Sequence, residues 1–271
     1  MRAIILAAGQ GTRLRPLTDD RPKCMVELEG KPLLEHQLEV LRGAGIDDIH
    51  VVGGYRAEWL QRPDITLHIN ERFDHTNRVA TLVAAESVMD GSEDLIIAYG
   101  DIVYEPRVLQ ALLECDAPVC LTVDRAWRRY WEARMDDPLA DAETLKLTDG
   151  NRITELGKKP SSYEEIQGQY MGLIKVRADH VPQLPAVWRA MDRTATYDGK
   201  DYDNMYMTSF LQHLIDNGWV IRAALIENGW LEVDGAGDLA LAARRLTPHQ
   251  AAPRVCPPPT LTDEPTPWAN Y

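Results

Sequence analysis

Short apolar runs alternate with amphipathic stretches through the first half of the chain. Four of these runs predict buried strands, at Ile4–Ala7, Ile49–Gly53, Leu95–Tyr99 and Val119–Val123. Between them the pattern predicts helices over Leu33–Arg42, over Thr76–Met89 with Thr76 or Asn77 as its cap, and from Pro106 onward. This alternation is typical of an α/β fold, in which helices flank a mostly parallel sheet and ligands bind at the carboxyl ends of its strands.

Shorter elements follow Asp124. Apolar runs at Leu145–Thr148, Arg152–Leu156 and Tyr170–Val176 predict a small mixed β extension over the active site, and the turn Asp149-Gly150-Asn151 predicts a hairpin. A helix over Asp203–Asp216 and a strand over Trp219–Leu225 are expected next. Seven of the chain's 17 prolines fall in the last 26 residues, so we expect one domain over residues 1–245 and a proline-rich tail over 246–271.

Composition narrows the class of protein. A net charge of −13 over 271 residues argues against a nucleic-acid partner, because no basic stretch is present to neutralise a phosphodiester backbone. No apolar run is long enough to cross a bilayer, and the first residues enter a strand rather than a signal peptide. We therefore expect a cytoplasmic protein without a membrane partner, while the sequence leaves a homodimer open.

A glycine-rich loop follows the first strand, in the string Ala7-Ala8-Gly9-Gln10-Gly11-Thr12-Arg13. Such a loop brings backbone N–H groups close to phosphate oxygens. A Walker loop is excluded because Gly11 precedes Thr12-Arg13 rather than a lysine, and a dinucleotide fingerprint is excluded because Leu14 replaces the third glycine. The separated cations Arg13 and Lys23 are suited to a triphosphate. The alternative is a strand-to-helix turn with solvated basic residues.

Carboxylates occur at two places where predicted strands end. Asp101 follows the buried strand Leu95–Tyr99, and Glu232 and Asp234 lie two positions apart, on one face of a strand. Two like charges on one face repel each other unless a cation lies near them, and Mg²⁺ prefers hard oxygen ligands. The pattern predicts a magnesium ligand at Asp101 and a cation near Glu232 and Asp234. The alternatives are a turn cap for Asp101 and a solvated carboxylate for Glu232.

The string GxGTR(x)nPK, spanning Gly9 to Lys23, resembles the signature of the nucleotidyltransferases that activate sugar phosphates and related small phosphates. The resemblance extends to about Leu246 and implies the nucleotidyltransferase form of the Rossmann-like fold. It implies that Ala7, Ala8, Gly9, Gly11 and Thr12 bind the nucleoside triphosphate and that Arg13 and Lys23 neutralise its phosphates during attack at the α-phosphorus. It further implies that Asp101 and Asp234 hold Mg²⁺, with Asp101 and Glu232 beside the bound nucleotide.

Two further segments bear on the substrates. The run Glu155-Leu156-Gly157-Lys158-Lys159-Pro160 resembles the family's acceptor-binding segment. Lys159 aligns best with the acceptor-binding lysine, although strand register decides between it and Lys158, and an exposed turn is the alternative. The stretch Asn70–Asn77 departs from the glutamine-proline-glycine loop of hexose 1-phosphate enzymes and resembles the NExYxxxN pattern of the phosphocholine and phosphonate cytidylyltransferase branch, which implies that Asn77 lies near the cytidine.

The resemblance therefore implies transfer of CMP from CTP to a small phosphonate or phosphomonoester of the 2-aminoethylphosphonate or phosphocholine type, with release of pyrophosphate. The alternative is a hexose 1-phosphate nucleotidylyltransferase that uses dTTP, UTP or GTP. Trp127 and Trp131 either form an aromatic wall for an acceptor amine, with Asp141 or Glu143 as its counter-charge, or pack inward at helical spacing. The sequence does not decide between these two interpretations.

Overall fold

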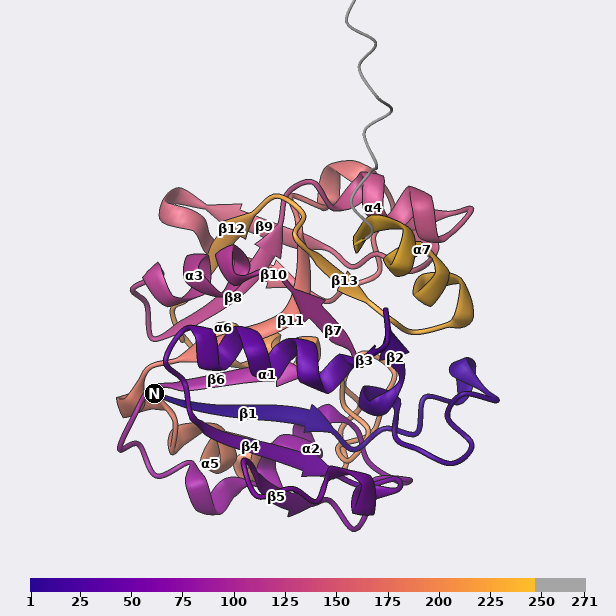
Figure 1. The fold of residues 1–271 in the computed structure, drawn as a ribbon. Coiled ribbons are helices and arrows are strands. Elements are labelled where there is room, and N and C mark those ends of the chain that lie inside the picture. The colour runs from indigo at the N-terminus through magenta and orange to yellow at the C-terminus, as the bar shows by residue number, and fades with distance from the viewer. Residues whose placement is uncertain (247–271) are drawn as a thin grey trace, which may run out of the picture.

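One nine-stranded sheet forms the centre of the computed structural model, which describes residues 1–246 (Figure 1). From one edge to the other its strands are β5 (Thr66–Ile69), β4 (Asp48–Gly53), β1 (Arg2–Ala7), β6 (Leu95–Tyr99), β11 (Gln169–Val176), β8 (Val119–Asp124), β12 (Ile221–Ile226), β10 (Arg152–Leu156) and β9 (Leu145–Thr148). Strands β5, β4, β1 and β6 are parallel, and β11 runs antiparallel to both of its neighbours. The predicted α/β fold with a mostly parallel mixed sheet is confirmed.

Helices cover both faces of this sheet. They are α1 (Leu33–Gly43), α2 (Arg78–Val83), α3 (Pro106–Glu114), α4 (Trp127–Arg134), α5 (Gln183–Ala190), α6 (Met207–Asp216) and α7 (Ala236–Leu246). In Figure 1, α1 passes in front of the sheet, whereas α2 and α5 lie behind it. Helix α1 forms as expected because Leu34, Leu38 and Leu41 fall on one face and are fully buried there.

The predicted hairpin is present, with β9 and β10 antiparallel around a turn at Asp149–Asn151. Gly150 takes a left-handed backbone there, with φ +68°. The hairpin does not form a separate sheet, because β10 pairs with β12. The strands expected in a small β extension therefore belong to the main sheet: β9 and β10 form its edge, whereas β11, predicted as Tyr170–Val176, lies between β6 and β8.

Three predicted boundaries are wrong. The helix expected over Thr76–Met89 ends at Val83, because the chain tightens into a turn and then a short 3₁₀ helix at Glu86–Val88. The helix expected from Asp203 begins at Met207, since Asp203 lies in a loop whose carbonyl oxygen accepts the Asn77 N–H at 3.0 Å. The strand expected from Trp219 starts at Ile221, because its residues pair with β8 from Val119 onward.

Two small sheets lie outside the large one. Strands β2 (Glu27–Leu28) and β3 (Lys31–Pro32) form one, and β7 (Ile102–Tyr104) pairs antiparallel with β13 (Trp230–Glu232) in the other. Strand β7 begins directly after Asp101, and Glu232 lies opposite Ile102. The Val233 N–H also donates to the Asp101 carbonyl oxygen at 3.0 Å. This pairing brings the early and late carboxylates of the sequence together.

Two sequence expectations concern the ends of the fold. Helix α7 extends to Leu246, so the proline-rich tail expected over 246–271 falls, apart from its first residue, outside the described residues. Within residues 1–246 no helix combines the length and the apolar character needed to cross a membrane.

Candidate active site

A cavity of about 290 Å³ lies where β1 ends in the glycine loop. Ten of the predicted site residues line it: Ala7, Ala8, Gly9, Gly11, Thr12, Arg13, Lys23, Asn77, Asp101 and Asp234. The remaining lining residues are Leu6, Cys24, Phe73, Thr76, Arg78, Thr81 and Gly100. The structure thus brings together, in one cavity, residues from five separate parts of the chain.

Gly11 allows the glycine loop to lie against the side chain of Lys23. Its φ of +69° is a left-handed conformation, and a Cβ there would lie 2.9 Å from Cβ and Cγ of Lys23. The Thr18 hydroxyl donates to the Gly11 carbonyl at 2.8 Å and fixes the loop from the other side. The glycine is therefore required for both the backbone angle and the path of the Lys23 side chain.

The Lys23 ammonium lies between two carboxylates. It donates to Oδ2 of Asp101 at 2.7 Å and also to Oδ1 of Asp234. Burial alone would lower the pKa of Lys23, but the charges of Asp101 and Asp234 outweigh burial and raise it. The Arg13 guanidinium reaches Oδ2 of Asp234 at 3.1 Å with 71% of its side chain exposed, so it borders the open side of the cavity. Two cations are thus available to phosphate oxygens entering the cavity.

A third cation, Arg78, was missed by the sequence analysis. Its Nη2 donates to Oδ2 of Asp101 at 3.1 Å, and its guanidinium carbon lies 4.1 Å from the centre of the Tyr99 ring. Arg78 is the first residue of α2, directly after Asn77. The only sequence signal for it was a cation directly after the predicted helix cap.

Three carboxylates converge beside these cations. One oxygen from each of Asp101, Glu232 and Asp234 lies within 4.8 Å of the other two. Oδ1 of Asp101 is buried and has no hydrogen-bond partner in the part of the chain that the structure describes. Burial would raise the pKa of Asp101, but the charges of Lys23 and Arg78 hold it well below its usual range, so this carboxylate is ionised. A buried, unpartnered carboxylate oxygen next to two more carboxylates fits a divalent cation of the Mg²⁺ type.

Asn77 is both a helix cap and a wall of the cavity. Its side-chain oxygen accepts the Arg78 N–H at 2.8 Å, and its amide nitrogen donates to the Asn204 carbonyl at 3.2 Å. The capping role expected for this region therefore belongs to Asn77 rather than Thr76. Phe73 and Thr76 line the cavity beside it, and the expected place of Asn77 near the cytidine stays a prediction.

The lysines expected at the acceptor lie apart from this cavity. The Lys159 amine donates to the carbonyl oxygens of Leu139 and Ala140, at 2.7 and 2.6 Å, and the Lys158 amine pairs with Asp198 at 2.6 Å. Lys159 therefore holds the loop that continues into Asp141. Its role as the acceptor's cation stays a prediction.

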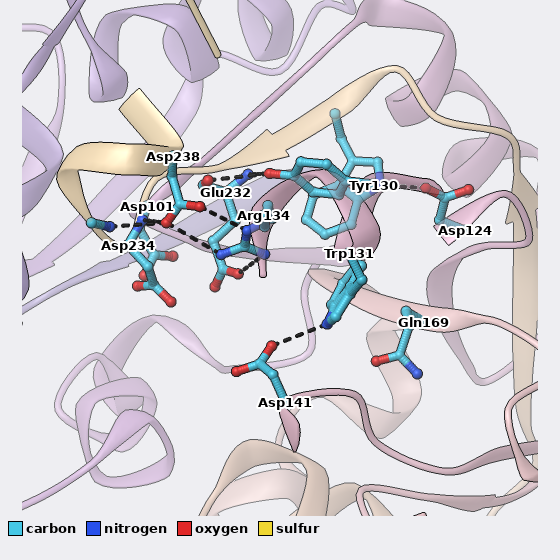
Figure 2. A network of polar contacts seen from close by, with 12 residues as sticks. Asp101, Asp124, Tyr130, Trp131, Arg134, Asp141, Gln169, Glu232, Asp234 and Asp238 are labelled. Atoms are coloured by element: carbon cyan, nitrogen blue, oxygen red, sulfur yellow. Dashed lines mark hydrogen bonds and ion pairs between the residues drawn. The ribbon is translucent and has the colours of Figure 1, made fainter. Parts of the chain in front are cut away.

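Trp127 and Trp131 are buried, at 4% and 5% exposure. Their rings pack edge to face, with centroids 5.8 Å apart, and the Trp131 ring also packs against Trp230. This packing favours the core interpretation for the two tryptophans. The indole N–H of Trp131 donates from Nε1 to Oδ2 of Asp141 at 3.0 Å (Figure 2).

Glu143 lies two residues further along the same loop. Its backbone N–H donates to Oε1 of Gln169 at 3.2 Å, and Nε2 of Gln169 donates back to its carbonyl oxygen at 2.5 Å. Burial and the charge of Asp141 raise the pKa of Glu143 to about 7, despite a hydrogen bond from Thr208 and the charge of Arg78. The loop thus carries a carboxylate whose ionised form would be stabilised by an added cation.

Known proteins are similar over most of the chain. A 44% identical relative over 248 residues, covering 88% of this chain and 98% of its own length, is a CTP:phosphoglutamine cytidylyltransferase of Campylobacter jejuni. A UTP–glucose-1-phosphate uridylyltransferase of Haloferax volcanii is 37% identical over 253 residues, covering 91% of this chain and 96% of its own. The solved structure of the CTP:phosphocholine cytidylyltransferase of Streptococcus pneumoniae covers 90% of this chain and 98% of its own, with a TM-score of 0.66 at 19% identity.

The family model for the MobA-like NTP transferase domain matches residues 3–195, which contain the glycine loop, Lys23, Arg78 and Asp101. The family expected from the GxGTR…PK string is therefore confirmed, and the structural likeness confirms the nucleotidyltransferase fold. The chain belongs to the MobA-like NTP transferase family and is a nucleotidyltransferase.

Proposed function

We propose that this nucleotidyltransferase transfers CMP from CTP to a small phosphomonoester or phosphonate that carries an amine, with release of pyrophosphate. The observation that carries the proposal is the meeting of Asp101, Glu232 and Asp234 beside a glycine-loop cavity that also contains Lys23 and Arg13. This arrangement supplies the positioning and charge neutralisation that nucleotidyl transfer requires.

In the proposed reaction an oxygen of the acceptor's phosphate or phosphonate attacks the α-phosphorus of CTP in line. The new P–O bond forms as the bond from the α-phosphorus to the bridging oxygen breaks, and pyrophosphate leaves with that electron pair. Backbone N–H groups of Gly9 to Thr12 contact the triphosphate, and Arg13 and Lys23 offset its negative charge. No side-chain nucleophile is needed.

Asp101 and Asp234 are the proposed ligands of Mg²⁺, with Glu232 as the third carboxylate of the cluster. When bound there, Mg²⁺ would supply positive charge to the phosphate oxygens as charge develops on the leaving pyrophosphate. Lys23 contacts both aspartates, and we propose that its ammonium shifts its contacts toward the phosphates once substrate arrives.

The preference for cytidine is supported by the Asn70–Asn77 loop, from which Phe73, Thr76 and Asn77 line the cavity. The names of the Campylobacter and Streptococcus proteins, both CTP-dependent, agree with this preference. A second candidate is a hexose 1-phosphate acceptor with dTTP, UTP or GTP, which the similarity to the Haloferax uridylyltransferase favours.

An amine on the acceptor is supported by the charge of Glu143, whose carboxyl interacts with the charge of Arg78, a residue of the cavity wall. Burial and the charge of Asp141 raise the pKa of the Glu143 carboxyl, so a cation beside it would stabilise its ionised form. The acceptor's ammonium would supply that charge. Both phosphoglutamine and phosphocholine, named for the two cytidylyltransferases, carry such a nitrogen.

A pyrophosphate-release assay tests the proposal. Each of CTP, UTP, dTTP and GTP is combined with phosphocholine, 2-aminoethylphosphonate, phosphoglutamine or glucose 1-phosphate, in the presence of Mg²⁺. We expect release from CTP with an amine-bearing acceptor, and its loss in Asp101→Asn and Asp234→Asn. Asp179→Asn, which changes an exposed aspartate paired with Arg177, is the matched control and keeps full activity. Release only with glucose 1-phosphate would overturn the proposal in favour of the second candidate.

A further inference from the structure

Arg134 is a buried cation beside the carboxylate cluster that the proposed reaction does not use. Its side chain is 4% exposed. Nη1 donates to Oε2 of Glu232 at 3.1 Å, and Nε donates to Oδ1 of Asp238 at 2.8 Å. Figure 2 shows the guanidinium lying between these two carboxylates. Because a planar guanidinium fixes the direction of each N–H, the two carboxylates are held in a set relative geometry.

Asp238 carries this restraint to the backbone of Asp234. Its Oδ2 accepts the N–H of Asp234 at 3.0 Å and the N–H of Gly235 at 2.9 Å. Asp238 lies in the first turn of α7, so it also ties the start of that helix to the segment that carries Asp234. The position of Asp234 thus depends on an aspartate whose own side chain is held by Arg134.

The other side of the guanidinium is fixed by aromatic rings. Its carbon lies 5.1 Å from the centre of the Tyr130 ring and 5.5 Å from that of Trp131. The Tyr130 hydroxyl accepts the Glu232 N–H at 2.9 Å, so the same helix also holds the backbone of Glu232. Both the side chain and the backbone of Glu232 therefore hydrogen-bond to α4, in addition to the pairing of its strand with β7.

We propose that Arg134 is a positioning residue of the transfer reaction, which sets Glu232 directly and Asp234 through Asp238 in the geometry that takes the divalent cation. The inference rests on the proposed function, because it assigns to those carboxylates the role of cation ligands. Replacing a residue that hydrogen-bonds to a metal ligand lowers the metal affinity by about 10- to 100-fold.

The test measures cation binding without turnover. Mn²⁺ replaces Mg²⁺ and is titrated into protein with CTP but no acceptor, and free Mn²⁺ is followed by electron paramagnetic resonance. We expect Arg134→Met to weaken Mn²⁺ binding by at least tenfold. Arg134→Lys should recover part of that loss, since an ammonium keeps the charge but lacks the planar fork that spans both carboxylates.

Arg62→Met is the matched control. Arg62 also bridges two carboxylates, Glu35 and Asp64, but lies away from the cavity, and its replacement should leave Mn²⁺ affinity unchanged. Circular dichroism of each variant establishes that it is folded. If Arg134→Met does not fold, Asp238→Asn takes its place, because an asparagine retains the oxygen that accepts the two backbone N–H groups but loses charge toward Arg134.

The outcomes separate the two proposals. A folded Arg134→Met, or Asp238→Asn in its place, with parent-like Mn²⁺ affinity overturns the positioning role and leaves the proposed function standing. A parent protein that binds no Mn²⁺ and releases no pyrophosphate overturns both. Weakened Mn²⁺ binding in the Arg134 variants, with an unchanged Arg62→Met, supports the positioning role.

Discussion

Replacing Glu143 by glutamine should stabilise the protein at high pH. The side chain is largely buried, and burial together with the charge of Asp141 raises its pKa to about 7 from the ordinary value of 4.5. At about 1.4 kcal/mol for each pH unit, this difference corresponds to about 3 kcal/mol of unfolding free energy. Glutamine keeps the shape and can still accept the hydrogen bond from Thr208, but it has no charge to desolvate.

The raised pKa of Glu143 determines how the stability difference between the variant and the parent depends on pH. Below pH 4.5 the carboxyl is protonated in both the folded and the unfolded protein, so Glu143→Gln should change little. As the pH rises from 4.5 to 7 the unfolded chain ionises first, and the parent loses stability that the variant retains. Above pH 7 the advantage of the variant reaches its full value of about 3 kcal/mol.

Urea unfolding at pH 4.5 and pH 8.5 measures this difference. The exposed Glu71→Gln serves as control and should have the same midpoint as the parent at both pH values. If Glu143→Gln shifts the urea midpoint equally at both pH values, or lowers it at pH 8.5, the reasoning from burial is refuted.

In the pyrophosphate-release assay, Glu143→Gln should raise the KM for the amine-bearing acceptor and leave the KM for CTP unchanged. A stabilising change that removes function is the signature of a residue kept for binding.

Two further predictions concern the glycine loop and the acceptor lysine. Gly11→Ala should raise the KM for CTP and lower the melting temperature by several degrees, because the new Cβ would lie 2.9 Å from the Lys23 side chain. Gly30→Ala is the control, since Gly30 has a similar φ but a Cβ there would have nothing within 4 Å. This variant should change the melting temperature less and leave the KM for CTP unchanged. Calorimetry and steady-state kinetics check both, and equal effects in the two variants would contradict the close-contact argument. Lys159→Met should raise the acceptor KM more than Lys158→Met does, and an unchanged KM in the pyrophosphate assay would show that Lys159 only holds its loop.

The glycine loop could be predicted from the sequence because its determinants are local. The buried strand, the two glycines and Arg13 follow one another within a dozen residues, and Gly11 takes the left-handed backbone that such a loop requires. Lys23 was also singled out, as the second cation of the segment and the last residue of the GxGTR…PK string, and the structure places it in the same cavity. Its contact with both Asp101 and Asp234 was not foreseen, since it depends on residues 78 and 211 positions away.

Helix ends were predicted less well because tertiary contacts decide them. The residues directly after Val83 are not of types that break a helix, yet the α-helix ends there. The segment from Asp203 was expected to be helical, but its carbonyl groups instead accept hydrogen bonds from Asn77. These contacts fix the wall of the cavity at the cost of the regular helix, and no local pattern contains them.

The carboxylate cluster illustrates the limit of periodicity most clearly. Alternation placed Glu232 and Asp234 on one face of a strand, but β13 ends at Glu232 and Asp234 lies beyond it. What brings them to Asp101 is the antiparallel pairing of β13 with β7, two three-residue strands more than a hundred positions apart. Strands this short give no reliable alternation, so their pairing could not be predicted.

Arg134 was missed for a related reason. In the sequence it is one of several cations near a helix end, and only its burial between Glu232 and Asp238 distinguishes it from a solvated arginine. The geometry of the proposed cation site is therefore a property of long-range pairing, whereas the residue types that form it are a property of the local sequence.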